Sequence, residues 1–248
     1  MERCIYGMIL ILTGIFHVQA QKPEYRLNDT LYVWEMHGVT MIDDPQSPGQ
    51  VKNRYYYGSP ARVVDINPGT RPVSMEVNEG YELPGHWVRV IINRDTGFVF
   101  DGFLGAFPPF DLRSDAQGIE LVQKNYSGSA HVSKAVRSST PQEGLADGES
   151  QEMQFENGIQ WELKKVKPCL IEKYTIPTNR YAEAYQFMMA VYSNYFDQDA
   201  NFMAEPEFLR QNGNKTEFIL RGNGGNQQIA VYKSGNAYLI NAFTCTDE

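Results

Sequence analysis

Residues 27–110 carry short apolar runs separated by glycine and proline turns. Runs of this length that are rich in Val, Ile, Tyr, Phe and Trp are typical of β-strands. The pattern predicts strands at residues 31–34, 51–57, 61–66, 87–92 and 98–100, with a hairpin turn over residues 93–97. Several short strands joined by tight turns indicate a small all-β barrel or sandwich.

Apolar residues also alternate on both sides of Asn157-Gly158, which is a strong hairpin signal. A two-residue loop would place Phe155 opposite Gln160 and send the two apolar sets to opposite faces. A three-residue loop with a left-handed Gly158 places Phe155 opposite Ile159 and Met153 opposite Trp161. The register therefore predicts a bulged, three-residue turn.

A helical period follows, and it predicts a helix over residues 179–196, just after Pro177. Its apolar stripe is expected to pack on a sheet. A shorter helix is predicted at residues 205–212. Strands are expected at residues 216–221, 227–233 and 237–243, with Val231 opposite Tyr238 and Ile229 opposite Ile240. These elements indicate an α+β domain in which one main helix lies on an antiparallel sheet.

The segment between these two parts is rich in Ser, Gly, Gln and charged residues and poor in bulky apolar ones. Such a composition is typical of a linker, and we expect residues 127–150 to be its mobile part. The predicted organisation is a β-barrel domain at 21–112, an irregular linker at 113–151 and an α+β domain at 152–248.

The first twenty residues have the pattern of a secretory signal peptide. Arg3 gives a positive start, residues 8–16 are apolar, and Val18-Gln19-Ala20 resembles a small-residue cleavage site. Cys4 precedes the apolar run, so it does not fit a lipid-anchored cysteine. No other apolar stretch approaches the length of a membrane span. We therefore expect a cleaved, exported protein that is periplasmic or secreted.

Composition and charge narrow the possible partners. The chain has 248 residues and a formal net charge of −8, which argues against nucleic-acid binding because that requires Lys/Arg patches. Two cysteines remain after the predicted signal, Cys169 and Cys245. In an oxidising compartment they are candidates for a disulfide; the alternative is two independent buried thiols.

Residues 29–107 resemble a bacterial SH3 domain. The resemblance rests on five stretches that occur in the family's order and spacing: 29–33, 38–45, 57–64, 85–90 and 96–104. It implies an SH3-like barrel that binds peptide or cell-wall material. Two departures stand out: Ile42 replaces an arginine usual in the second stretch, and residues 67–84 form a long insertion, which is expected to cover or extend the binding groove. Residues 150–248 resemble no family that we recognise.

An aromatic groove would suit this kind of binding, since flat rings stack on sugars and prolines at small entropic cost. The candidate ligand-binding residues are Tyr32, Trp34, Tyr55, Tyr56, Tyr57 and Phe103. By contrast, four residues are expected to fill the barrel, because alternate residues of a small barrel point inward. These four are Trp87, Val90, Phe98 and Phe100.

The sequence contains no recognisable catalytic set, cofactor motif or metal site. After the signal there are three histidines, His37, His86 and His131, and none lies in a motif typical of hydrolases. Residues 197–201 begin like a calcium loop, but its sixth and twelfth positions hold phenylalanine. The glycine-rich stretch 222–226 lacks the residues of a phosphate loop and is interpreted as a turn.

The leading hypothesis is therefore an exported, non-enzymatic binding module for peptidoglycan, a peptide or a protein partner. The alternative is an interaction or inhibitor protein of the immunity type, because an acidic surface suits basic partners. A second alternative is an enzyme with its site in the C-terminal domain, where Glu172, Tyr174 and Glu183 are candidate polar residues.

Overall fold

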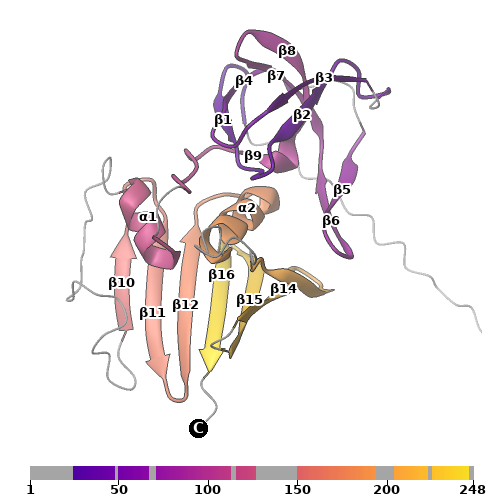
Figure 1. The fold of residues 1–248 in the computed structure, drawn as a ribbon. Helices are drawn as coiled ribbons and strands as arrows, with labels where there is room; N and C mark the ends of the chain where they lie inside the picture. Colours follow the sequence, from indigo (N-terminus) through magenta and orange to yellow (C-terminus); the bar gives the residue numbers. More distant parts are fainter. Residues whose placement is uncertain are drawn as a thin grey trace, which may run out of the picture.

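The computed structural model describes residues 25–47, 50–66, 71–112, 116–126, 150–193, 204–222 and 225–245. The predicted signal peptide, the calcium-like residues 197–201 and nearly all of the expected mobile segment 127–150 lie outside these ranges. The described chain is mostly antiparallel β-structure with two α-helices (Figure 1). It forms two seven-stranded sheets and one two-stranded sheet.

The first sheet contains all five strands expected from the sequence, and two further short ones. In chain order its strands are β1 (Thr30–Val33), β2 (Val39–Ile42), β3 (Val51–Tyr55), β4 (Pro60–Asp65), β7 (Trp87–Ile92), β8 (Asp95–Phe100) and β9 (Leu104–Gly105), with the short 3-10 helix η1 (Asp101–Phe103) before β9. They pair in the order β3-β2-β8-β7-β4-β1-β9, so the described pairing leaves the sheet open between β3 and β9. Asn93 and Arg94 make the β7–β8 turn, and both have a positive φ.

The insertion at residues 67–84 contributes a hairpin, β5 (Val73–Asn78) and β6 (Tyr81–Gly85), that reaches toward the second sheet (Figure 1). The Tyr81 ring stacks on Phe208, with the ring centroids 5.0 Å apart. The Asn78 side chain donates to the carbonyl of Pro206 at 2.9 Å and accepts the Phe208 amide at 2.8 Å. The hairpin therefore joins the two sheets.

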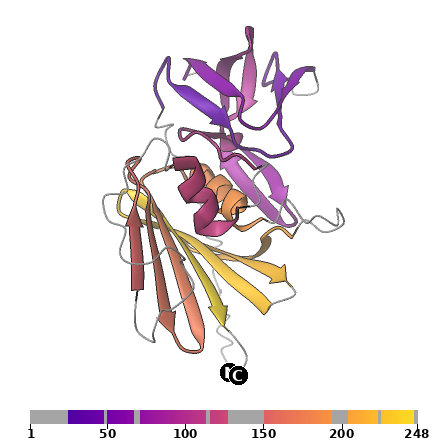
Figure 2. The same cartoon turned by 60° about the vertical axis from the view of Figure 1, so that its left-hand side comes forward.

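The second sheet is antiparallel throughout and pairs in the order β10-β11-β12-β16-β15-β14-β13. Its strands are β10 (Ser150–Gln154), β11 (Gln160–Val166), β12 (Cys169–Ile176), β13 (Glu207–Asn212), β14 (Lys215–Gly222), β15 (Gly225–Ser234) and β16 (Ala237–Cys245). Helices α1 (Gly118–Tyr126) and α2 (Tyr181–Tyr192) lie on one face of this sheet (Figures 1 and 2).

Two predicted hairpin registers have different outcomes. The bulged turn is confirmed: Met153 pairs with Trp161, and the Phe155 amide donates to the Ile159 carbonyl at 2.9 Å. The β15–β16 register was wrong, because Val231 faces Ile240 and not Tyr238. The expected pairing would make Ser234 and Gly235 the two turn residues, whereas in the structure Ser234 pairs with Ala237 and the turn is Gly235 and Asn236. The shift is two residues, so every side chain keeps its predicted face.

The structure also corrects two expected helices and the expected linker. Residues 205–212 were expected to be helical, but β13 occupies most of this range, because Phe208 packs on the Tyr81 and Phe218 rings at the sheet's edge. The main helix is shorter than predicted and ends at Tyr192. Helix α1 lies inside the expected linker, and its apolar residues explain why it docks: Ile119, Leu121, Val122 and Tyr126 are buried.

Helix α2 is buried all the way round, as every residue from Ala182 to Tyr192 is buried. One side faces the second sheet, and the other contacts η1 and β9 of the first. Phe187 shows the arrangement: its ring lies 5.3 Å from Phe110 and 5.4 Å from Tyr174, centroid to centroid. One hydrophobic cluster therefore spans both sheets, across the boundary expected near residue 112.

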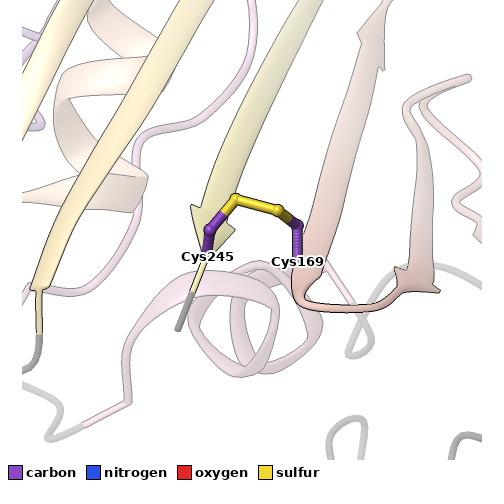
Figure 3. Close-up of a disulfide and its surroundings, with 2 residues drawn as sticks. All are labelled: Cys169 and Cys245. Atoms are coloured by element: carbon purple, nitrogen blue, oxygen red, sulfur yellow. A yellow bond between two sulfur atoms is a disulfide. The ribbon is translucent and has the colours of Figure 1, made fainter. Parts of the chain in front are cut away.

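Cys169 and Cys245 form a disulfide in the structure (Figure 3). The two residues face each other on β12 and β16, with their Cα atoms 4.0 Å apart. These strands lie side by side at the centre of the second sheet. The disulfide thus ties the β10–β12 half of the sheet to the β13–β16 half.

Candidate functional site

Of the six candidate aromatic residues, Trp34 belongs to the core that joins the sheets and Tyr57 packs beside it. Trp34 is only 2% exposed, and its Nε1 donates to the Phe107 carbonyl at 2.8 Å. The Tyr57 ring lies edge-on to Trp34, and its hydroxyl accepts the Phe110 amide at 3.1 Å. Both polar atoms are thus used inside the protein. This corrects the expectation that Trp34 lines an open groove.

The other four candidates are divided between core and surface. Tyr55 is buried, and its hydroxyl donates to Asp95 Oδ2 at 2.6 Å. Tyr56, the next residue along the chain, is 78% exposed. Tyr32 and Phe103 are partly buried against the core. The six rings therefore do not line one exposed groove, because strand alternation turns neighbouring side chains to opposite sides.

A pocket of about 290 Å³ lies where the first sheet meets the start of α2. Three segments far apart in sequence form it: the chain up to and into β1, the residues after β9, and the loop from β12 to α2. Its lining residues are Tyr25, Asp29, Thr30, Leu31, Ala106, Phe107, Pro177, Thr178, Arg180 and Glu183. We call it the junction pocket and take it as the candidate site.

Glu183 holds the floor of this pocket together. It lies in the first turn of α2 and is only 4% exposed. One carboxylate oxygen accepts a hydrogen bond from the Ala106 amide. The other accepts a hydrogen bond from the Thr178 hydroxyl at 2.6 Å. Thr178 Oγ1 in turn accepts the Arg180 amide at 3.1 Å. A buried carboxylate needs such donors, so the loop before α2 is fixed to the first sheet.

Arg180 brings a positive charge to the pocket. Its Nη2 donates to the Asp101 carbonyl at 2.6 Å, and the guanidinium carbon lies 5.1 Å from the Tyr25 ring centroid. These two contacts fix the plane of the group. Nη1 is buried and has no hydrogen-bond partner within the described part of the chain. The guanidinium therefore has an unused donor.

Asp101 lies next to this guanidinium and hydrogen-bonds to several neighbours. Its carboxylate accepts the Tyr25 hydroxyl at 3.0 Å and the His86 amide at 2.7 Å. Burial alone would raise the pKa of Asp101, but the hydrogen bonds from His86 and Tyr25 and the charge of Arg180 together hold it below its ordinary value. Burial and the Asp101 charge raise the pKa of Tyr25, so Tyr25 stays a hydrogen-bond donor.

This cluster predicts a dependence of stability on acid. The stability that ionised Asp101 contributes is complete above the ordinary aspartate pKa, and it is lost as pH falls through the lowered value. In urea unfolding between pH 7 and pH 2.5, Asp101→Asn should lose less stability than the wild type on acidification. The difference is about 1.4 kcal/mol for each pKa unit of depression. The exposed-site control Glu82→Gln should follow the wild type; equal slopes for all three proteins would contradict the role given to Asp101.

The polar residues considered for an enzyme do not converge on this pocket. Glu172 accepts hydrogen bonds from Trp161 Nε1 and from the hydroxyls of Tyr174 and Tyr192, at 2.8 to 3.0 Å. Tyr192 is the last residue of α2, whereas Glu183 lies in its first turn. Glu172 and Glu183 are therefore anchored near opposite ends of the helix, and both use their oxygens to hold the fold.

Tyr25, Asp29 and Arg180 were missed by the sequence reasoning. Glu183 was recognised as a polar candidate, but nothing local connects it to residues 25–31. Of the three histidines, His86 contacts Asp101, His37 is exposed, and His131 lies outside the described residues. In the part of the chain that the structure describes, no group of three or more His, Cys, Asp or Glu side chains is placed to hold a metal ion.

Neither helix in the described ranges is long and apolar enough to cross a membrane. Comparison of the whole chain with protein-family models, with curated proteins and with solved structures finds no significant match in any of the three.

Proposed function

We propose that this protein is an exported, non-enzymatic binding module that recognises a cell-wall peptide or glycan, or a protein partner. In this proposal the first sheet is an SH3-like barrel extended by the β5–β6 hairpin, and the second sheet with its helices is an α+β unit. The junction pocket is the observation that carries the proposal. Its lining offers two aromatic rings, two threonine hydroxyls, a guanidinium and two carboxylates, a mixture suited to a polar organic ligand.

The surroundings of the pocket support a binding role. Three part-buried hydrogen bonds fix lining residues of two of its segments: Trp34 Nε1 to the Phe107 carbonyl, the Ala106 amide to Glu183, and Arg180 to the Asp101 carbonyl. A site that is already ordered loses less entropy when a ligand binds. The exposed ring of Tyr56 is a second candidate contact, because it is the one residue of the predicted aromatic set that is mostly exposed and free to stack on a sugar.

Filling the pocket should weaken ligand retention. Thr30 lines the pocket and is exposed, so Thr30→Trp places an indole in it with little disturbance of the core. Thr40→Trp is the matched control, because Thr40 is equally an exposed strand residue but lies on β2, away from the pocket. In co-sedimentation with insoluble peptidoglycan, we expect about tenfold weaker binding for Thr30→Trp and wild-type binding for Thr40→Trp.

Two results would count against this proposal. One is equal retention of both tryptophan variants, and the other is no retention of the wild type on peptidoglycan or on any peptide tested. Retention that depends on Tyr56→Ala but not on Thr30→Trp would move the site to the exposed ring and away from the pocket.

The charge of the chain supports a second candidate, an inhibitor or immunity-type protein. The formal net charge of −8 favours encounter with a basic partner. Such a complex should form more slowly as salt rises, because screening shortens the range of the attraction. Affinity capture at low and high salt distinguishes it from peptidoglycan binding by the identity of the captured material.

A further inference from the structure

We propose that the junction pocket takes a free α-carboxylate attached to a small residue, as carried by a free amino acid or by the C-terminus of a peptide, with Arg180 as its anion partner. This inference rests on the proposed binding function, which it deepens by naming the ligand chemistry. It does not depend on Tyr56 or on the SH3-like interpretation of the first sheet.

The first argument is the state of Arg180. Its guanidinium lines the pocket and holds a fixed plane, with Nη2 bound to the Asp101 carbonyl and the face against Tyr25. Nη1 is buried and has no hydrogen-bond partner in the described part of the chain, so the fold leaves this part of the guanidinium unpaired. A carboxylate matches the guanidinium fork in charge and geometry better than any neutral acceptor.

The second argument is that the nearby acidic groups do not fill this role. Arg180 reaches Asp101 through the backbone carbonyl, while the Asp101 carboxylate accepts from Tyr25 and His86. Both oxygens of Glu183 are used by Ala106 and Thr178. The Arg180 charge stabilises the nearby Asp101 carboxylate, but no carboxylate is hydrogen-bonded to the guanidinium in the described part of the chain, and we expect a ligand carboxylate to take that place.

The third argument concerns size and the remaining polar groups. A volume of about 290 Å³ corresponds to about ten water molecules, or a ligand of about ten non-hydrogen atoms. This volume holds one or two small residues. Asp29 and Thr30 are exposed at the rim, where they are suited to accept from the ammonium or amide of the same ligand.

The test uses the purified protein and four probes in isothermal titration: alanine, alanyl-alanine in both enantiomers, alanyl-alanine amide, and N-acetyl-alanyl-alanine. We expect alanyl-alanine to bind and its amide, which lacks the carboxylate, to bind at least about tenfold more weakly. Acetylation should cost less than amidation. Alanine binding as tightly as the dipeptide would identify a free amino acid as the source of the carboxylate, and weaker alanine binding would identify a peptide end.

Variants supply the second arm. Arg180→Gln should lose about tenfold or more in dipeptide affinity, and Arg180→Lys should fall between it and the wild type, because lysine keeps the charge but not the fork. Arg89→Gln, an exposed site on β7, is the matched control and should bind normally. The amide probe works on the wild-type protein, so the inference stays testable even if Arg180→Gln folds poorly.

Equal binding of dipeptide and amide, or no binding of any probe, would overturn the inference. If peptidoglycan retention survives in Arg180→Gln but is lost in Thr30→Trp, the binding function stands and the carboxylate assignment fails. If retention is absent in the wild type while alanyl-alanine binds through Arg180, the ligand assignment stands and the cell-wall target fails.

Discussion

Replacing both Cys169 and Cys245 by alanine should lower the free energy of unfolding by about 4 kcal/mol. The disulfide closes a loop with a sequence separation of 76, and a closed loop of that size strongly restricts the unfolded chain. The loss of stability affects the centre of the second sheet, because the disulfide joins β12 and β16, which are neighbours there. Guanidinium unfolding of the wild type and the double variant measures the difference directly.

The reductant gives the control for this experiment. Dithiothreitol should bring the wild type down to the stability of the double variant, and it should leave the double variant itself unchanged. Cys245 is exposed at the end of β16, so the reductant can reach the bond. A loss below about 1 kcal/mol would show that the unfolded chain is restricted by something other than this bond.

Phe187→Ala should cost about 3–5 kcal/mol, the usual range for removing a fully buried aromatic ring. The ring is 1% exposed and contacts Trp34 and Phe110 on one side of α2 and Tyr174 on the other. Since these neighbours belong to the part before residue 112 and to the second sheet, the variant should destabilise both halves together. Phe243→Ala, at an exposed position on β16, should cost well under 1 kcal/mol.

Two spectroscopic probes distinguish unfolding of the part before residue 112 from unfolding of the whole protein. Tryptophan fluorescence of a protein with Trp161 replaced by phenylalanine reports on Trp34 and Trp87, and far-ultraviolet dichroism reports on all the strands. We expect the two transitions to coincide in both the wild type and Phe187→Ala. Two separate transitions, with only one shifted by the mutation, would show that the cluster across the sheets does not couple them.

Local pattern predicted much of the secondary structure and little of its assembly. Short runs of β-forming residues between glycine and proline turns located β1, β3, β4, β7 and β8, and the apolar register located the bulged turn at Gly158. The helix expected at residues 205–212 does not form, because Phe208 is held at a sheet edge by Tyr81, which lies far away in sequence. Long-range packing overrides local preference in such cases.

The candidate site shows the same limit more strongly. Among the three consecutive tyrosines, strand alternation turns the ring of Tyr56 outward, where it is exposed. The junction pocket, however, is assembled from residues 25–31, 106–107 and 177–183, which no motif connects. Arg180 looks in sequence like an ordinary residue before a helix. Its importance follows from where the first sheet places Asp101 and Tyr25.

The position of β16 between β12 and β15 has a consequence for the order in which the sheet is made. A ribosome releases β12 well before β16, so the newly made β12 must wait with one edge unpaired while the intervening residues appear. β15 likewise lacks its inner neighbour until then. During this interval the nascent chain exposes strand edges that invite association with other chains. The sheet can be completed only once residues 237–245 have been synthesised. Slow or interrupted translation of these residues should therefore favour aggregation.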